Sequence, residues 1–406
     1  MYSLYRVKQA ALAAWTNDII VYFYLESDDM KQKIIDAAKS IGINMIGFTN
    51  VLDYSYLYDL LNNRKSNGYS CEFEEQDIAK RLDVRNIFPK CKFIIVIGVP
   101  YAEGYKKPST NNKGLISVVS YGEDYHKNLN ILLNNLATEI KKHVDFQYKI
   151  CVDTSPLIDR EICKNAGIGN YGKNSMLINE KYGSFINIGY LLTSLEIECT
   201  DGQNDNDICK DCELCIKSCP NKAIFKEGGI NATRCVSYLT QTKNYIPLEY
   251  RKSMKNQIYG CDVCQVVCPK NKINSEKTST IDVSKLLIDL DELLNISNKE
   301  FLNKYGNLSG SWRGRNVWKR NALIAIGNLK LLNLFGAVEK ELNNSSTMIK
   351  MYAAWCLMNL NKENAVKILH NQLKFENDTI KTEFMKLAEA EYDSGNLWNR
   401  TYNIWS

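Results

Sequence analysis

Eight of the fourteen cysteines lie between residues 209 and 268, and their spacing is typical of iron–sulfur ligands. The first run reads Cys-x2-Cys-x2-Cys-x3-Cys-Pro over residues 209–220. In this spacing three thiolates bind one 4Fe–4S cluster and the fourth reaches a second cluster. The second run, at residues 261–269, has only three cysteines. Cys235 lies on the stretch that connects the runs, where it can supply the missing thiolate.

We therefore predict two 4Fe–4S clusters with crossed ligand sets. The ligands of the first cluster are Cys209, Cys212, Cys215 and Cys268, and those of the second are Cys219, Cys235, Cys261 and Cys264. Cys199 is an alternative to Cys235. A zinc site is less favoured, because zinc takes four thiolates from two separated pairs and does not use a crossed cysteine that precedes proline. Disulfides are disfavoured because a chain of 406 residues can bury its own core.

The composition is that of an ordinary globular chain, with 45% hydrophobic and 24% charged residues. Its length suits two or three domains. The net charge is only +5, so an attraction to a polyanion must come from local clustering. Cysteines available for iron indicate a reducing compartment, and we predict a cytoplasmic protein.

The first 29 residues differ from the rest of the chain. Their apolar stretch is interrupted by Asn17 and Asp18 and has no small-residue cleavage site. It is therefore a poor signal peptide and too broken for a membrane span. We expect residues 1–29 to be an N-terminal extension, with the functional chain beginning at Met30.

Apolar patterns predict an α+β domain over residues 30–205. Helical periodicity occurs at residues 30–41 and again at residues 129–144. The β-rich runs are residues 44–48, 93–99, 148–152, 176–178 and 186–192. The cysteine window then defines a second domain at residues 206–275.

The remaining residues, 276–406, have a helical character. Helices are expected at residues 317–329, 348–360 and 378–391. Apolar residues recur at a spacing of 31 positions, as in Trp318, Ile349 and Ile380. This period favours a small stacked α-solenoid, and a plain helical bundle is the alternative.

Basic and aromatic residues concentrate at the start of this helical part. Residues 301–330 contain no acidic residue. The cations are Lys304, Arg313, Arg315, Lys319, Arg320 and Lys330, and they are interspersed with Trp312 and Trp318. Cations neutralise phosphates and exposed aromatics stack on unpaired bases, so this stretch could bind structured RNA. The alternatives are a solvated charged face and core tryptophans.

A candidate catalytic carboxylate, Asp153, follows the predicted strand at residues 148–152. The segment continues through Ser155 and Pro156. Asp, Thr and Ser before a proline at the first helical position commonly satisfy free amides. From the local sequence alone, a helix-start role for Asp153 is at least as well supported as catalysis.

Several blocks resemble the epoxyqueuosine reductase family. They are Ile78-Ala-Lys-Arg81, Tyr121-Gly-Glu-Asp124-Tyr125-His126, Asp153-Thr154, Gly167-Ile-Gly169, the cysteine window, Arg234-Cys235-Val-Ser237, Tyr259-Gly260-Cys261-Asp262 and Ser309-Gly310-Ser311-Trp312-Arg313-Gly314. The blocks occur in family order from about Met30 to the C-terminal repeats, whereas residues 1–29 have no counterpart.

The resemblance implies a nitroreductase-like cobalamin-binding domain, a two-cluster ferredoxin-like domain and HEAT-like helical repeats that bind tRNA. The implied reaction reduces epoxyqueuosine to queuosine at the wobble position of tRNA, with electrons passing from the clusters to cobalamin. The histidine-donating motif Asp-x-His-x-x-Gly is absent, since residues 124–129 end in Leu129. This departure agrees with a base-off cobalamin.

The resemblance also implies roles for individual residues. Asp153 matches the proton donor, and we expect burial against the corrin to raise its pKa so that it holds a proton. The implied cofactor contacts are Arg81, Ser237 and Asp262, for which ordinary loop-ordering hydrogen bonds are the alternative. From the basic stretch at residues 301–330 and the basic residues that follow Cys235, we predict tRNA contacts at Lys243, Trp312, Arg313 and Arg315. His126 could orient a residue that contacts the cofactor or substrate, or it could be a core histidine whose hydrogen bonds are made within the protein.

The predicted partners are tRNA carrying epoxyqueuosine and an external low-potential electron donor, with no membrane, for a monomeric protein. A corrinoid reductive dehalogenase is the nearest rival enzyme, and it would be expected to carry an export signal and no RNA-binding surface. A ferredoxin-type electron-transfer protein is the rival from another class. It would need neither corrin nor RNA.

Overall fold

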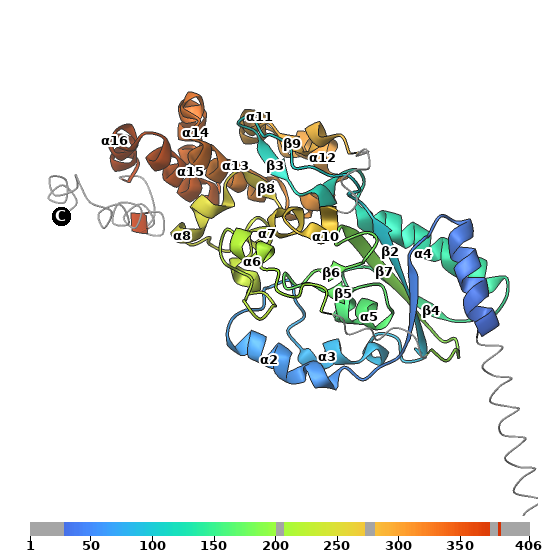
Figure 1. Cartoon of the computed structure of the whole chain (residues 1–406). Helices are drawn as coiled ribbons and strands as arrows, with labels where there is room; N and C mark the ends of the chain where they lie inside the picture. Colours follow the sequence, from blue (N-terminus) through green and yellow to red (C-terminus); the bar gives the residue numbers. More distant parts are fainter. Residues whose placement is uncertain (1–27, 200–206, 273–280, 374–380, 383–406) are drawn as a thin grey trace, which may run out of the picture.

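The computed structural model describes residues 28–199, 207–272, 281–373 and 381–382 (Figure 1). The predicted extension at residues 1–29 and the predicted helix at residues 378–391 lie almost wholly outside these ranges. The segments next to both predicted domain boundaries, residues 200–206 and 273–280, also lie outside them.

The first part of the chain is built on a four-stranded antiparallel sheet with the order β1-β2-β7-β4. The strands are β1 (Ile46–Asn50), β2 (Phe93–Pro100), β7 (Ile186–Thr193) and β4 (Tyr148–Cys151). Residues 93–97 of β2 are fully buried, and alternate side chains enter two different cores. Layers of structure therefore cover both faces, which explains the unbroken apolar run in the sequence.

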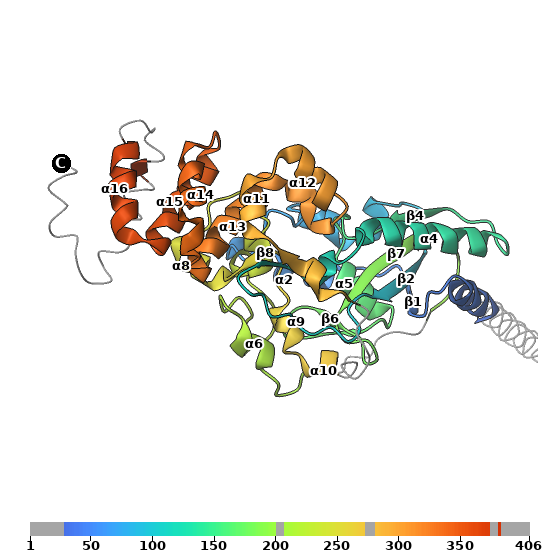
Figure 2. The same cartoon turned by 90° about the horizontal axis from the view of Figure 1, so that it is seen from above.

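Helices form these layers (Figures 1 and 2). One face packs against a helix at residues 28–40 and against α4 (Tyr125–Lys141). The other face packs against α5 (Asp159–Asn165), α2 (Tyr58–Ser66) and α3 (Ile78–Leu82). A short hairpin of β5 (Asn170–Tyr171) and β6 (Leu177–Ile178) follows α5. The segment at residues 176–178 was predicted as a strand, and β6 occupies most of it.

Two short helices carry cysteines of the window and pack against each other: α6 (Leu214–Ser218) and α9 (Val263–Val266). The other helices of this part are α7 (Val236–Leu239), α8 (Leu248–Arg251) and α10 (Pro269–Lys272). An isolated bridge between Ile224 and Ile230 closes the turn after the first cysteine run.

A second sheet joins segments that are far apart in the sequence. Strand β3 (Gly114–Ile116) lies between β8 (Gln257–Tyr259), to which it is parallel, and β9 (Leu287–Ile288), to which it is antiparallel. The three strands come from the three regions that the sequence divides into domains. These regions therefore share backbone hydrogen bonds and one continuous hydrophobic core.

The C-terminal part is helical, as predicted. Its helices are α11 (Leu290–Asn295), α12 (Asn298–Tyr305), α13 (Arg315–Leu329), α14 (Phe335–Lys340), α15 (Thr347–Leu360) and α16 (Lys362–Leu373). Helices α13 and α15 pack together, and the repeat-related Trp318 and Ile349 are both fully buried. Short 3-10 turns connect elements throughout: η1 (Ser55–Leu57), η2 (Val84–Asn86), η3 (Val118–Ser120), η4 (Ala232–Arg234), η5 (Lys252–Met254), η6 (Val283–Leu286), η7 (Ser309–Arg313), η8 (Leu332–Leu334) and η9 (Glu341–Asn343).

Among the described residues, no helix is both long enough and apolar enough to cross a membrane.

Candidate active site

The eight cysteines of the window gather into two neighbouring groups. Cys215 interacts electrostatically with Cys209, Cys212 and Cys268. Cys264 interacts in the same way with Cys235, Cys261, Cys215 and Cys219. Apart from the contact between Cys215 and Cys264, these sets coincide with the crossed sets predicted from spacing.

The thiols of these groups suit an iron–sulfur cluster. Burial, with a smaller contribution from the nearby thiols, raises the pKa of the Cys261 thiol to about 12. Four thiolates held together would repel one another, and iron removes this cost by binding them in the deprotonated form. Backbone N–H groups also point at sulfur: Ala223 N lies 3.2 Å from Sγ of Cys219, and Lys173 N lies 3.4 Å from Sγ of Cys209.

Cys199, the alternative ligand, lies elsewhere. Its Sγ is 3.5 Å from the carbonyl oxygen of Phe48, and its own carbonyl accepts a hydrogen bond from Asn50 at 3.0 Å. These contacts hold Cys199 beside β1. The placement of Cys235 next to Cys219 therefore favours Cys235 as the eighth ligand.

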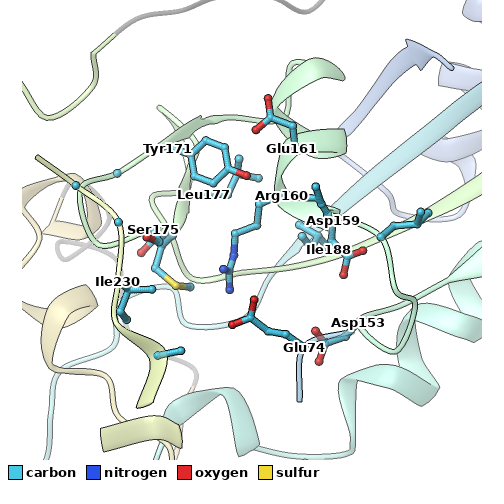
Figure 3. Close-up of a pocket in the computed structure, with 18 of the residues that line it drawn as sticks. Glu74, Asp153, Asp159, Arg160, Glu161, Tyr171, Ser175, Leu177, Ile188 and Ile230 are labelled. Carbon is cyan, nitrogen blue, oxygen red and sulfur yellow. The ribbon is translucent and has the colours of Figure 1, made fainter. Parts of the chain in front are cut away.

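A large cavity adjoins the first group of cysteines. Its volume is about 970 Å³, and Asp153 and Cys209 both line it (Figure 3). Ligand pockets range from roughly 300 to 1,000 Å³, so this cavity has room for a large organic cofactor. The walls come from α2, the loop before α3, the loop between β4 and α5, the β5–β6 hairpin and residues 225–232.

Asp153 occupies a strained position directly after β4. Its φ is +53°, in the left-handed region that non-glycine residues seldom adopt. The helix-start alternative is wrong, because α5 begins at Asp159 with Ile158 at its N-cap and no side chain caps it. The strained turn instead presents the carboxylate to the cavity, where it is exposed.

Two neighbours surround the Asp153 carboxylate. The phenol of Tyr125 donates a hydrogen bond to Oδ2 at 2.6 Å, and Nε2 of His126 lies 3.6 Å from the same oxygen. The nearby His126 imidazole and the Tyr125 hydrogen bond lower the pKa of Asp153. These contacts stabilise the charged form of the carboxylate. The expectation that burial against a corrin raises this pKa stays a prediction.

The His126 imidazole is the second titratable group beside this cavity. The nearby Asp153 carboxylate raises the pKa of the imidazole, and Asp124 adds to the effect. Asp124 accepts hydrogen bonds from both the backbone N of His126, at 3.0 Å, and its Nδ1, at 2.7 Å. Because Asp124 is also the N-cap of α4, the helix start fixes the ring between the two carboxylates.

Arg81 also lines the cavity. Its Nη1 lies 3.2 Å from Glu74, which also accepts a hydrogen bond from Arg64 at 3.0 Å. The Nε of Arg81 is buried and has no hydrogen-bond partner among the described atoms. A buried donor of this kind is costly, and a polar group of a bound cofactor could satisfy it.

The other two predicted cofactor contacts do not line the cavity. Asp262 is buried; it accepts hydrogen bonds from the Ser117 hydroxyl and, at 2.9 Å, from the backbone N of Val118. It thereby orders η3, whose Val119 does line the cavity. The carbonyl of Ser237 caps the following turn through Gln241 at 3.0 Å. Asp262 and Ser237 therefore make loop-ordering hydrogen bonds, which were the alternative to a direct cofactor contact.

Sequence reasoning left several cavity residues without a role. Figure 3 shows Glu74, Asp159, Arg160, Glu161 and Tyr171 around the cavity, with the Arg160 side chain extending into its centre. Burial raises the pKa of Asp159 to about 6, although the Tyr190 hydroxyl donates to it at 2.6 Å. The signal available in the sequence was the charged run of residues 159–161, six to eight positions after Asp153.

Two cations of the basic stretch are buried and have structural partners. Arg320 is fully buried and donates to the carbonyls of Thr242 and Leu239, at 2.8 and 2.9 Å. Lys319 is buried in an ion pair with Glu341 at 2.8 Å. Arg320 on α13 therefore binds the tail to the segment after Cys235, whereas Lys319 pairs within the tail.

The four predicted tRNA contacts have different environments. Lys243 is exposed, and 58% of Trp312 is exposed, whereas Trp318 belongs to the core. Arg313 is mostly buried and donates to the carbonyl of Gln241 at 2.6 Å. Arg315 is partly buried and donates to the carbonyl of Ile296 at 3.2 Å.

Two groups of four thiols beside a large cavity define an iron–sulfur protein of the two-cluster class. The model of the 4Fe-4S double cluster binding domain matches residues 208–271, and that of "Epoxyqueuosine reductase QueG, DUF1730" matches residues 81–154.

Curated relatives extend the match to most of the chain. The epoxyqueuosine reductase of Staphylococcus aureus is 36% identical over 89% of this chain and 97% of its own length. The Lactococcus garvieae enzyme is 42% identical over 74% of this chain and 87% of its own length. The chain therefore belongs to the epoxyqueuosine reductase family, a family of oxidoreductases.

Solved structures agree. The structure of epoxyqueuosine reductase with an epoxyqueuosine-modified tRNA-Tyr stem loop has a TM-score of 0.84 at 35% identity, covering 89% of this chain and 99% of that one. The Bacillus subtilis enzyme, with its aspartate catalytic loop swung out of the active site, has a TM-score of 0.82 at 34% identity, with the same coverage. The predicted family is confirmed.

Proposed function

We propose that this chain reduces epoxyqueuosine to queuosine in the anticodon of tRNA. The observation that carries the proposal is that Asp153 and Cys209 line the same cavity, so a proton donor and an electron source face one space. The solved relative that holds an epoxyqueuosine-modified stem loop supports the substrate. Removal of the epoxide oxygen as water consumes two electrons and two protons.

The cofactors are two 4Fe–4S clusters and a base-off cobalamin. The first cluster takes Cys209, Cys212, Cys215 and Cys268, and the second takes Cys219, Cys235, Cys261 and Cys264. Cobalamin, when bound, supplies a low-valent cobalt that accepts single electrons from the clusters and performs the difficult reduction. The volume of the cavity and the buried Nε of Arg81 fit such a group. Arg81 would hold it directly, whereas Asp262 and Ser237 would order the loops around it.

Asp153 transfers the proton. The pKa of its carboxylate is lowered and it accepts the Tyr125 hydrogen bond, while the raised pKa of His126 makes the imidazole a proton source beside it. Burial and the Asp153 charge raise the pKa of Tyr125, so the phenol stays neutral and orients the carboxylate. Asp153 would relay one proton from His126 to the departing epoxide oxygen; solvent would supply the second proton, and the clusters the two electrons.

The domain organisation follows the same proposal. Residues 30–205 would form a nitroreductase-like cobalamin domain, residues 206–275 a ferredoxin-like domain, and residues 276–406 a HEAT-like unit that binds tRNA through Lys243, Trp312, Arg313 and Arg315. The packing of α13 on α15 supports a stacked helical tail. The cytoplasmic location, the monomeric state and the external low-potential donor stay predictions.

The test is conversion of the substrate. Protein purified without oxygen, reconstituted with iron, sulfide and cobalamin, and supplied with a strong small-molecule reductant should convert epoxyqueuosine-containing tRNA to queuosine-containing tRNA. Mass spectrometry of the digested nucleosides measures the product. Absence of product, with cluster and corrin absorption both present, would contradict the proposal.

A further inference from the structure

Two exposed aromatic rings from distant parts of the chain meet at the rim of the cavity. Phe73 belongs to the loop before α3, and Trp312 belongs to η7 at the start of the helical tail. Their ring centroids are 5.5 Å apart with an interplanar angle of 66°. Even so, 40% of Phe73 and 58% of Trp312 are exposed. The rings thus form a corner that is open to solvent.

Arg313 holds this corner in place. Its guanidinium carbon lies 4.6 Å from the Trp312 ring centroid and 5.0 Å from that of Phe73. Its Nε donates to the Gln241 carbonyl, and its Nη2 lies 3.5 Å from the Glu72 carboxylate. The charge of Arg313 is therefore balanced within the protein. Its role here is to fix two rings, which lowers the entropy lost when a ligand binds them.

The corner adjoins the catalytic carboxylate. Phe73 is itself one of the cavity-lining residues. The Trp312 side chain lies near Tyr259, and the charge of Asp153 raises the pKa of that same tyrosine. A group stacked on Phe73 and Trp312 would therefore lie beside the cavity that Asp153 lines.

We propose that Phe73, Trp312 and Arg313 form a stacking platform for one unpaired nucleobase of the tRNA anticodon loop. This proposal rests on the proposed function, because it assigns a place to part of the same substrate. Every base has a π-face, and rigid exposed aromatics bind unpaired bases by stacking. The exposed Lys243, two residues from the Gln241 that holds Arg313, adds a cation for the adjoining phosphate.

Fluorescence of a substituted base tests the stacking directly. Anticodon stem loops that carry 2-aminopurine at one loop position at a time are titrated with the reconstituted protein. We expect strong quenching at one position with the wild type and with Trp312→Phe, which keeps a ring. Trp312→Leu should abolish the quenching and weaken binding roughly 5- to 100-fold, the range for loss of one stacked base.

Two further variants separate stacking from damage to the fold. Phe73→Leu leaves the contact between Trp312 and Tyr259 in place and should weaken binding in the same direction as Trp312→Leu. Leu302→Ala removes an apolar side chain that is 54% exposed on α12, and it should bind like the wild type. Unchanged quenching and affinity in Trp312→Leu and Phe73→Leu would overturn the platform.

Turnover separates this inference from the proposed function. With a small-molecule reductant, Trp312→Leu should raise KM for tRNA and retain most of kcat. If the wild type converts epoxyqueuosine while both variants keep its KM, the platform is wrong and the function stands. If KM changes only when a protein supplies the electrons, the surface docks that donor and the platform is again wrong. No turnover by the fully loaded wild type would contradict the function itself.

Discussion

The Tyr125 hydroxyl donates a hydrogen bond to Oδ2 of Asp153 at 2.6 Å, and the same oxygen lies 3.6 Å from Nε2 of His126. The Tyr125 phenol stays neutral because its pKa is raised, and the pKa of the His126 imidazole is also raised. Asp153 is therefore held as a carboxylate with a proton source beside it. This arrangement separates orientation, by Tyr125, from proton supply, by His126.

The rate of turnover should depend on pH through His126. Its charged form predominates below the raised pKa, which lies above the ordinary value of 6.5. Turnover should thus be highest below that pKa and fall as pH rises through it. Single-turnover rates measured from about pH 6 to about pH 9 test this. In His126→Gln the rate should be low and lack this decline; an unaltered pH profile would remove His126 from the proton path.

The iron content should distinguish the two candidates for the eighth ligand. Two 4Fe–4S clusters contain about eight irons, so Cys235→Ser should retain roughly four. Cys199→Ser is the matched control and should retain all of them, because Cys199 contacts β1. Iron analysis and electron paramagnetic resonance after identical reconstitution provide the measurement. The reverse outcome would assign Cys199 as the ligand.

Removal of the Arg81 side chain should weaken cobalamin binding. Arg81→Ala deletes a cavity-lining donor, and we expect the Kd for cobalamin to rise roughly tenfold or more, as for the loss of a charged hydrogen bond. Arg85→Ala is the control, because Arg85 is exposed and pairs with Asp83. Titration of the apo-corrin protein by absorbance measures Kd. Equal values for both variants would exclude Arg81 as a contact.

The salt dependence of tRNA binding should separate the predicted contacts. Lys243→Ala should reduce the slope of log K against log salt by about one, since a single phosphate contact is lost. Arg313→Ala should lower affinity with little change in slope, because Glu72 already balances that charge. Lys285→Ala, on the exposed η6, is the control. A large slope change in Arg313→Ala would indicate a direct phosphate contact.

The sequence predicted those helices and strands whose apolar residues recur in a regular local pattern. The run that became β2 is buried on both faces, and α4 has an amphipathic period, so each was visible in the chain. The start of α5 was not, because Pro156 suggested a helix that begins only at Asp159. The second sheet was also missed, since β3 is three residues long and pairs only with distant strands.

The candidate site, too, was predictable where it depends on local sequence and not where it depends on distant residues. Cysteine spacing predicted the two groups of thiols because most ligands of a cluster follow one another at short, fixed intervals in the sequence. The pKa of Asp153 also depends on Tyr125 and His126, which approach from another element, so its own segment could not reveal these contacts. The burial of Arg320 depends on carbonyls of Leu239 and Thr242, far away in the sequence.

The most direct test of the central claim compares wild type with Asp153→Asn in a single turnover. Both proteins are first shown to carry equal cluster and corrin absorption, and each is then mixed with reductant and epoxyqueuosine-containing tRNA. We predict that queuosine forms in the wild type and that its rate falls roughly 100- to 10,000-fold in Asp153→Asn, the usual contribution of a general acid. Equal rates in the two proteins would contradict the assignment of Asp153 as the proton donor.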